Sequence, residues 1–100
     1  MLLINPVKIG DIVSVKLANS EELVGKLTDK NADGMTIDRP VVLTATRDGM
    51  TMVPFMMTAD PGTHGYTFKT EHVMICVPTI KSLANQYIQG TTGIMPANAA

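Results

Sequence analysis

The stretch Val15-Lys-Leu-Ala-Asn-Ser-Glu-Glu-Leu-Val-Gly-Lys-Leu27 decides the fold, because it reads as two alternating strands joined by a short polar turn. Apolar residues or glycine take every second position on both sides of the turn: Val13, Val15, Leu17, Leu23, Gly25 and Leu27. A half-buried strand requires this alternation, since successive side chains leave opposite faces of a sheet. A glycine inside a strand marks a sharp bend or a close backbone approach. The stretch therefore predicts a small, strongly curved antiparallel sheet or barrel.

The composition predicts one domain in a reducing compartment. The chain has 100 residues, is 45% hydrophobic and has a net charge of −1, which argues against a protein that coats duplex DNA through bulk charge. A single Cys76 excludes an intramolecular disulfide. The N-terminus lacks the pattern of a signal peptide, and no apolar run approaches the roughly 20 residues that a membrane helix needs. We therefore expect a cytoplasmic protein that does not bind membranes.

Turn residues and periodicity divide the rest of the chain into strands followed by one helix. The predicted strands are residues 8–17, 22–29, 35–46, 50–58, 66–69 and 72–77. Pro40 should put a break or an edge position in the third of them. From Pro78 the apolar period becomes helical, with Thr79 as the predicted N-cap and Gly90 as the stop. This gives a β domain over residues 1–79, a helix over 80–90 and a loose tail over 91–100, in which Ile94-Met95 is the only apolar pair.

Two of the predicted strands are apolar on both faces and carry few charges to deter pairing at a sheet edge. They are Met50-Thr-Met-Val-Pro-Phe-Met-Met57 and His72-Val-Met-Ile-Cys-Val77. Such strands are either covered inside the chain or paired with another copy of it. We favour pairing with another copy, so that the functional unit is an oligomer.

The strand-turn-strand stretch resembles the first motif of the Sm-like family, which includes the bacterial Hfq proteins. The matching positions are Val15, Leu17, Asn19, Leu23, Gly25 and Leu27, with Ser20 where the family has its turn glycine. Phe68-Lys-Thr-Glu-His-Val73 resembles the second motif, with Lys-Thr in place of Arg-Gly, and Val77-Pro-Thr79 resembles the end of the Hfq core. Unlike most of the family, this chain places its helix last. The resemblance is to a divergent member, of the type that tailed phages and marine microbes carry.

The resemblance implies a mainly β fold: a five-stranded, strongly bent antiparallel Sm-like (SH3-like) barrel with a short C-terminal helix. It also implies a ring-shaped homo-oligomer, from pentamer to heptamer, in which the fourth strand of one copy pairs with the fifth of the next. Sm-like rings bind single-stranded RNA near the pore. We therefore expect a non-catalytic ring that binds single-stranded RNA, or DNA, in nucleic-acid processing or regulation.

The nucleic-acid site implied by the two motif loops comprises Asn31, Asp33, Met35, Thr36, Phe68, Lys69 and Thr70. Lys69 replaces the motif arginine and would attract phosphate; its alternative is a solvated turn residue. Asn31, Asp33 and Thr36 would bond a base edge, although Asp33-Gly34 also reads simply as a hairpin turn. Met35 or Phe68 would stack on a base; the alternative for both is packing in the core.

No pattern in the sequence indicates an enzyme, a cofactor or a metal site. His72 and Cys76 lie four apart on a predicted strand and would share one face, but a structural zinc site typically needs four ligands. The eight methionines are most simply core and interface filler. The alternative function is a structural or protein-interaction ring of the same fold that binds no nucleic acid.

Overall fold

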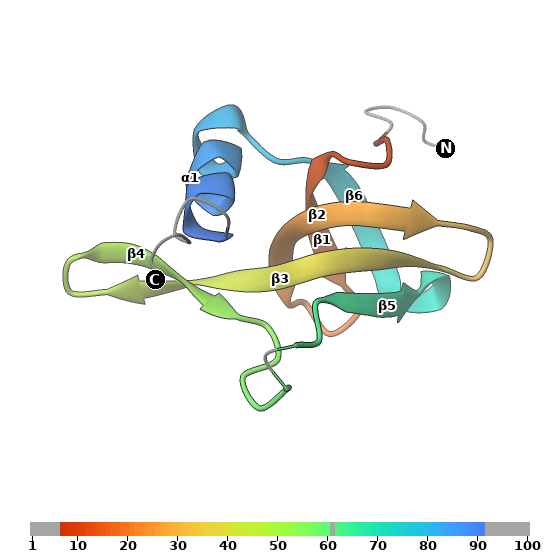
Figure 1. Ribbon diagram of the computed structural model, residues 1–100, viewed down its shortest axis with the longest axis horizontal. Helices are drawn as coiled ribbons and strands as arrows, with labels where there is room; N and C mark the ends of the chain where they lie inside the picture. Colours follow the sequence, from red (N-terminus) through yellow and green to blue (C-terminus); the bar gives the residue numbers. More distant parts are fainter. Residues whose placement is uncertain (1–6, 61, 92–100) are drawn as a thin grey trace.

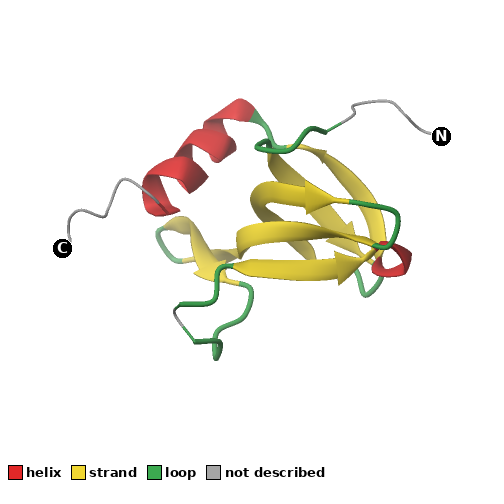
Figure 2. Cartoon of the chain, turned by 45° about the vertical axis from the view of Figure 1, so that its right-hand side comes forward, coloured by secondary structure: helices red, strands yellow, loops and turns green. Residues whose placement is uncertain are grey.

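The computed structural model describes residues 7–60 and 62–91 and folds them into a six-stranded antiparallel sheet followed by a helix (Figures 1 and 2). The predicted loose tail lies outside the described residues, except for Thr91. The elements are β1 (Ile12–Leu17), β2 (Glu22–Lys30), β3 (Gly34–Thr46), β4 (Gly49–Pro54), β5 (Gly65–Lys69), the 3-10 turn η1 (Thr70–His72), β6 (Val73–Pro78) and α1 (Lys81–Thr91). The α-helix that the structure describes is not long and apolar enough to cross a membrane.

The long strand β3 organises the sheet, because it pairs with three other strands. The strand order is β4-β3-β2-β1-β6, and β5 also pairs with β3. The first part of β3 pairs with β5, from Gly34↔Lys69 to Asp38↔Gly65, and the last part pairs with β4 from Val41↔Pro54 onward. Among the described strands no ladder joins β6 to β4 or β5, so strand pairing leaves the sheet open. The sheet thus has six strands, one for each predicted range and one more than the Sm-like resemblance implied, and β3 and β4 form a hairpin arm that extends from the rest of the sheet (Figure 1).

The predicted break in β3 lies at Pro40, where the ladder with β5 has ended and the ladder with β4 has not yet begun. Pro40 lies between the two ladders, and Arg39 before it has a φ of 48° in the left-handed region. Both ends of the 55–64 loop bond to this break: the Phe55 amide donates to the Pro40 carbonyl at 2.9 Å, and the Arg39 amide donates to the His64 carbonyl at 2.7 Å. The break therefore separates the β5 side of β3 from the β4 arm.

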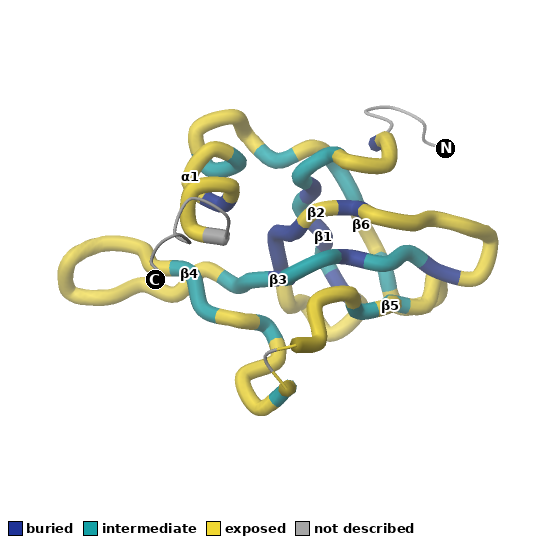
Figure 3. Tube along the Cα trace, in the orientation of Figure 1, coloured by how far each residue is buried: buried dark blue, intermediate teal, exposed yellow. Residues whose placement is uncertain are grey.

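The core lies inside the curve of the sheet, and the predicted alternation supplies it. Fully buried side chains come from β1, β2 and β3: Val13, Val15, Leu23, Leu27 and Ile37. Figure 3 shows this buried segment of the trace around the bend of β2, with exposed residues over most of the β4 arm and α1. Val7 and Leu17 complete the cluster. The first half of the chain thus contributes most of the core, and the C-terminal half covers it only in part.

Gly25 is both a bend and a close approach, as predicted. The pairing of β2 with β3 shifts register between Val24 and Lys26, and Figure 1 shows β2 curving strongly. A Cβ at Gly25 would collide with the Ile37 side chain, and it would lie 3.1 Å from the carbonyl oxygen of Asp38. Only glycine lets β3 cross β2 at this distance.

Three predicted boundaries were wrong for local reasons. The first strand starts at Ile12, because residues 8–11 form a turn in which the Asp11 amide donates to the Lys8 carbonyl at 3.0 Å. The fourth strand ends at Pro54 and not at residue 58. His72 belongs to η1 and not to a strand, so it does not share a strand face with Cys76.

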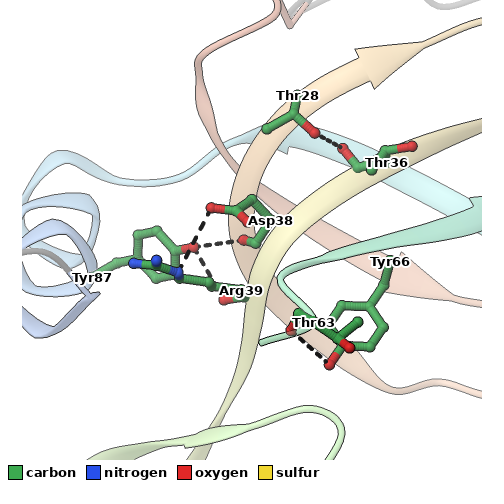
Figure 4. Close-up of polar contacts among 7 residues, drawn as sticks. All are labelled: Thr28, Thr36, Asp38, Arg39, Thr63, Tyr66 and Tyr87. Carbon is green, nitrogen blue, oxygen red and sulfur yellow. Dashed lines mark hydrogen bonds and ion pairs between the residues drawn. The ribbon is translucent and has the colours of Figure 1, made fainter. Parts of the chain in front are cut away.

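The helix α1 is held to the sheet through Tyr87. The predicted N-cap was wrong: α1 begins at Lys81, and the Thr79 hydroxyl instead bonds the Ser14 hydroxyl at 2.8 Å. The predicted stop was also wrong, since Gly90 lies within the helix. Five residues follow the predicted helical period. Among them Tyr87 is buried, at 2% exposure, Leu83 and Ala84 are half-buried, and Ile80 and Ile88 are exposed. The Tyr87 hydroxyl lies 2.7 Å from the carbonyl oxygen of Asp38 and 3.0 Å from that of Arg39, either of which accepts its proton (Figure 4).

Replacing Gly25 with alanine should destabilise the fold by about 1–3 kcal/mol, the usual cost of forcing extra volume into a packed core. Urea denaturation followed by circular dichroism measures the change. Gly90→Ala is the matched control, because a Cβ there meets nothing within 4 Å. Alanine inside a helix should raise stability by about 0.5–1 kcal/mol. An equal response of the two variants would contradict the close approach at Gly25.

Tyr87 should make stability fall at alkaline pH. Burial, with a smaller contribution from the nearby Asp38 carboxylate, raises the pKa of Tyr87 from 10 to about 12. The phenolate therefore forms more readily in the unfolded chain. The stability that the neutral Tyr87 hydroxyl gives the fold is fully present below pH 10 and is lost as the pH rises to 12. Tyr87→Phe should cost about 1 kcal/mol at neutral pH and flatten the fall above pH 10.

Urea unfolding at a series of pH values from 8 to 12 provides the test. Tyr66→Phe is the control, since the Tyr66 hydroxyl makes only a 3.3 Å bond to the Thr63 carbonyl in its own loop. If the wild type and Tyr87→Phe lose the same stability between pH 10 and pH 12, the alkaline loss is not due to Tyr87.

Candidate nucleic-acid interface

Four of the seven predicted site residues meet at one end of the sheet. Asn31 and Asp33 lie in the loop between β2 and β3, while Lys69 and Thr70 lie where β5 passes into η1. The β3–β5 ladder brings the two segments together, with Gly34 opposite Lys69. Figure 1 shows both at the end of the sheet away from α1 and the β4 arm.

The loop between β2 and β3 is an Asn-capped turn. The side-chain oxygen of Asn31 accepts the amide protons of Asp33 at 2.8 Å and Gly34 at 3.2 Å. The backbone N–H of Asn31 also donates to the Gly34 carbonyl at 2.9 Å. Asparagine is suited to this role because its short side chain reaches the backbone two residues on. The oxygen of Asn31 is thus committed to the loop, while its NH₂ group makes no hydrogen bond to the described residues.

Thr70 locks the second segment onto the first. Its backbone amide donates to the Asp33 carbonyl at 3.0 Å, and its hydroxyl donates to the Ala32 carbonyl at 3.1 Å. Gly34 lies so close to β5 that a Cβ would be 2.5 Å from the Phe68 carbonyl oxygen. The two loops therefore form one rigid unit. The Thr70 hydroxyl proton serves this unit and is not offered to a ligand.

Lys69 is the exposed cation of the unit. Among the described residues it makes no ion pair, so its ammonium group is available to solvent or a ligand. Glu71 is two residues from Lys69 along the chain, and Asp33 precedes Gly34, which pairs with Lys69 across the sheet. The Glu71 carboxylate is 3.7 Å from the His72 imidazole. These carboxylates offset part of the lysine charge, so attraction for phosphate at one copy is weak.

Met35 and Phe68 are opposite each other across β3 and β5, and both pack against the core. The rings of Phe68 and Phe55 have centroids 5.5 Å apart and are tilted by 60°, a favourable aromatic geometry. Of the two roles predicted for Met35 and Phe68, base stacking or core packing, the structure shows core packing. Both side chains are half-buried.

Thr36 lies on the opposite face of β3 from Met35, outside the core. Its hydroxyl is 3.0 Å from the hydroxyl of Thr67, and its carbonyl accepts a bond from the Thr28 hydroxyl at 3.3 Å (Figure 4). Thr67 stands on the same face of β5 as Lys69, which extends the polar surface beyond the loops. Sequence analysis missed Thr67, because only the register of β3 on β5 places it beside Thr36.

The Cys76 thiol is a core group. Cys76 is half-buried and packs against the core cluster, and burial raises its pKa, an effect that the charge of Lys30 partly offsets. Within residues 7–60 and 62–91, no group of three or more His, Cys, Asp or Glu could hold a metal ion. The two-loop unit thus carries one exposed cation, Lys69, and the NH₂ group of Asn31, which bonds no described residue.

Comparison with known proteins adds no assignment: no family model matches the chain, and no curated protein matches it.

Proposed function

We propose that this chain is an Sm-like subunit of a homo-oligomeric ring that binds single-stranded RNA or DNA in the cytoplasm without catalysing a reaction. The observation that carries the proposal is the rigid unit formed by the two motif loops, with Lys69 exposed and the Asn31 NH₂ group free of hydrogen bonds to the described residues. Those loops are the segments that the Sm-like resemblance implicates in RNA binding.

The strand connections support an Sm-like barrel. Without the β4 arm, five strands remain: β1, β2, the first part of β3, β5 and β6, with η1 joining the last two. Ser20, at the position of the family's turn glycine, has a φ of 77° in the left-handed region that glycine adopts most easily. We propose that these five strands curve into a small Sm-like (SH3-like) barrel.

The unpaired strand edges support the ring. Within the described chain β5 pairs only with β3, and β6 pairs only with β1. On β6 the Met74 and Ile75 side chains are 66% and 51% exposed, which is unusual for large apolar residues at a sheet edge. In the proposed ring, β5 of one copy pairs with β6 of the next and covers these side chains.

Symmetry would strengthen a weak site. One copy offers a single exposed lysine at the unit, but a ring repeats Lys69 around a common axis and concentrates its charge. The Asn31 NH₂ group would donate to a base carbonyl or a phosphate oxygen, and the Thr36–Thr67 hydroxyl pair would contact the strand beside it. Because the Phe68 ring packs against the core, base stacking contributes little, and affinity should depend on salt.

The second candidate is a structural or protein-interaction ring. Met74 and Ile75 favour assembly whether or not nucleic acid binds. The partial offset of the Lys69 charge by Asp33 and Glu71 is the observation that supports this second candidate.

Light scattering on a sizing column should give about 54 to 75 kDa, which is five to seven times the 10.7 kDa subunit. Ile75→Lys should shift this mass toward a single subunit, because it places an unpaired charge in the proposed interface. Met50→Lys, at a residue 64% exposed on β4, is the matched control and should keep the ring. A monodisperse wild-type monomer would refute the assembly.

Lys69→Ala should weaken binding of labelled oligo-U at low salt and reduce the salt slope by about one for each phosphate that the lysine neutralises. Lys81→Ala, at the start of α1, is the matched control and should leave binding unchanged. Asn31→Asp keeps the oxygen that caps the loop and removes the NH₂ donors, so it should also weaken binding.

Fluorescence anisotropy across a salt series measures both effects. The chain has no Trp and two Tyr, so nucleic acid that co-purifies would dominate its ultraviolet absorbance. An intact ring that is free of nucleic acid and binds neither oligo-U nor oligo-A would leave the structural ring as the function.

A further inference from the structure

A groove unrelated to the two-loop unit lies between the break in β3, the strand β4, the 55–64 loop and the end of α1. Its volume is about 650 Å³. Its apolar lining includes Pro40, Val41, Met52, Pro54, Met56 and Met57. The groove is a built feature, since the two hydrogen bonds at Phe55 and His64 fix both ends of its loop to the β3 break.

The groove exposes large apolar side chains. Met57 is 75% exposed and Met56 is 43% exposed, in the loop that follows β4. Methionine is flexible and polarisable, and it is over-used at surfaces that accept apolar segments of varied shape. The groove therefore has the chemistry of a site for an apolar segment.

The chain itself leads a segment of matching chemistry to this groove. Gly90, in the last turn of α1, lines the groove, and α1 ends at Thr91. The sequence continues as Thr92-Gly-Ile-Met-Pro-Ala-Asn-Ala-Ala100, which has no charged side chain and includes the apolar pair Ile94-Met95. At about 3.3–3.6 Å per residue, Ile94 reaches at most about 14 Å from Gly90, a distance comparable with the length of β4.

We propose that residues 92–100 bind in the groove of their own chain, with Ile94 and Met95 against Met56 and Met57. The short connection favours this occupant over a second copy, because a tether of a few residues gives an effective concentration in the millimolar range. The apolar pair of the segment fits the methionine and proline side chains of the groove, whose lining also includes Arg39, Asp60 and His64. This inference does not depend on the ring or on nucleic-acid binding.

Oxidation of the full-length protein by dilute hydrogen peroxide, with each methionine followed by mass spectrometry, tests this binding mode. Replacing both Ile94 and Met95 with serine should raise the oxidation rates of Met56 and Met57 severalfold, because the apolar pair no longer shields their sulfurs. Met74, on β6, should keep its rate. The matched control replaces Ala97 and Ala99 with serine and should change none of these rates. Unchanged rates at Met56 and Met57 in the first variant would overturn the proposal.

A second measurement distinguishes the chain's own segment from that of another copy. In a sample mixed from methyl-labelled and unlabelled protein, nuclear Overhauser effects between Ile94 and Met57 should arise only within one chain. Nuclear Overhauser effects between chains would overturn the proposal, because they would show that residues 92–100 of one copy bind in the groove of another copy. If neither kind is observed, the proposal is overturned altogether.

Discussion

The close crossing of β3 over Gly25 is the constraint on which the rest of the structure depends. With no Cβ at this position, the Ile37 side chain occupies the space that a Cβ would take, and such a Cβ would lie 3.1 Å from the carbonyl oxygen of Asp38. The crossing gives β2 its bend, and the bend encloses Leu23 and Leu27 in the core. It also places the start of β3 beside β5, so that the loops before Gly34 and after Lys69 meet. One missing methyl group thus positions the candidate interface.

The same crossing explains the break in β3. After Ile37 the pairing of β3 with β2 shifts register between Asp38 and Val41, and Arg39 in the left-handed region with Pro40 behind it lies at that shift. The carbonyl groups of Asp38 and Arg39 are then available to Tyr87, which fastens α1 to the sheet. The ion pair of Arg39 with Asp38, at 4.0 Å, lies at the same place (Figure 4). Helix, arm and loop therefore converge on three residues.

Much of the sheet could be predicted from sequence, because alternation and turn residues act locally. The bend at Gly25, the break at Pro40 and the turn before Gly49 all follow from properties of single residues. Features set by distant pairing were predicted less well. Thr79 was expected to cap α1 but bonds Ser14, 65 residues away. Of the apolar residues in α1 only Tyr87 is fully buried, while Leu83 and Ala84 are half-buried and Ile88 is exposed. At the candidate site, Asn31, Asp33, Lys69 and Thr70 were brought together as expected, whereas the inward direction of Met35 and Phe68 depends on the β3–β5 register.

The division of β3 at Pro40 has a consequence for how the molecule opens. The β4 arm pairs only with the last part of β3, beyond the break, and the largest fully buried side chains come from β1, β2 and the part of β3 before it. The arm therefore forms a separate cooperative unit that unfolds at a lower free energy than the body of the sheet. Amide hydrogens between Val41 and Pro54 would exchange through this local opening, and those of β1 and β2 through global unfolding. An insertion in the turn between β3 and β4 would therefore cost less stability than one in the turn between β1 and β2.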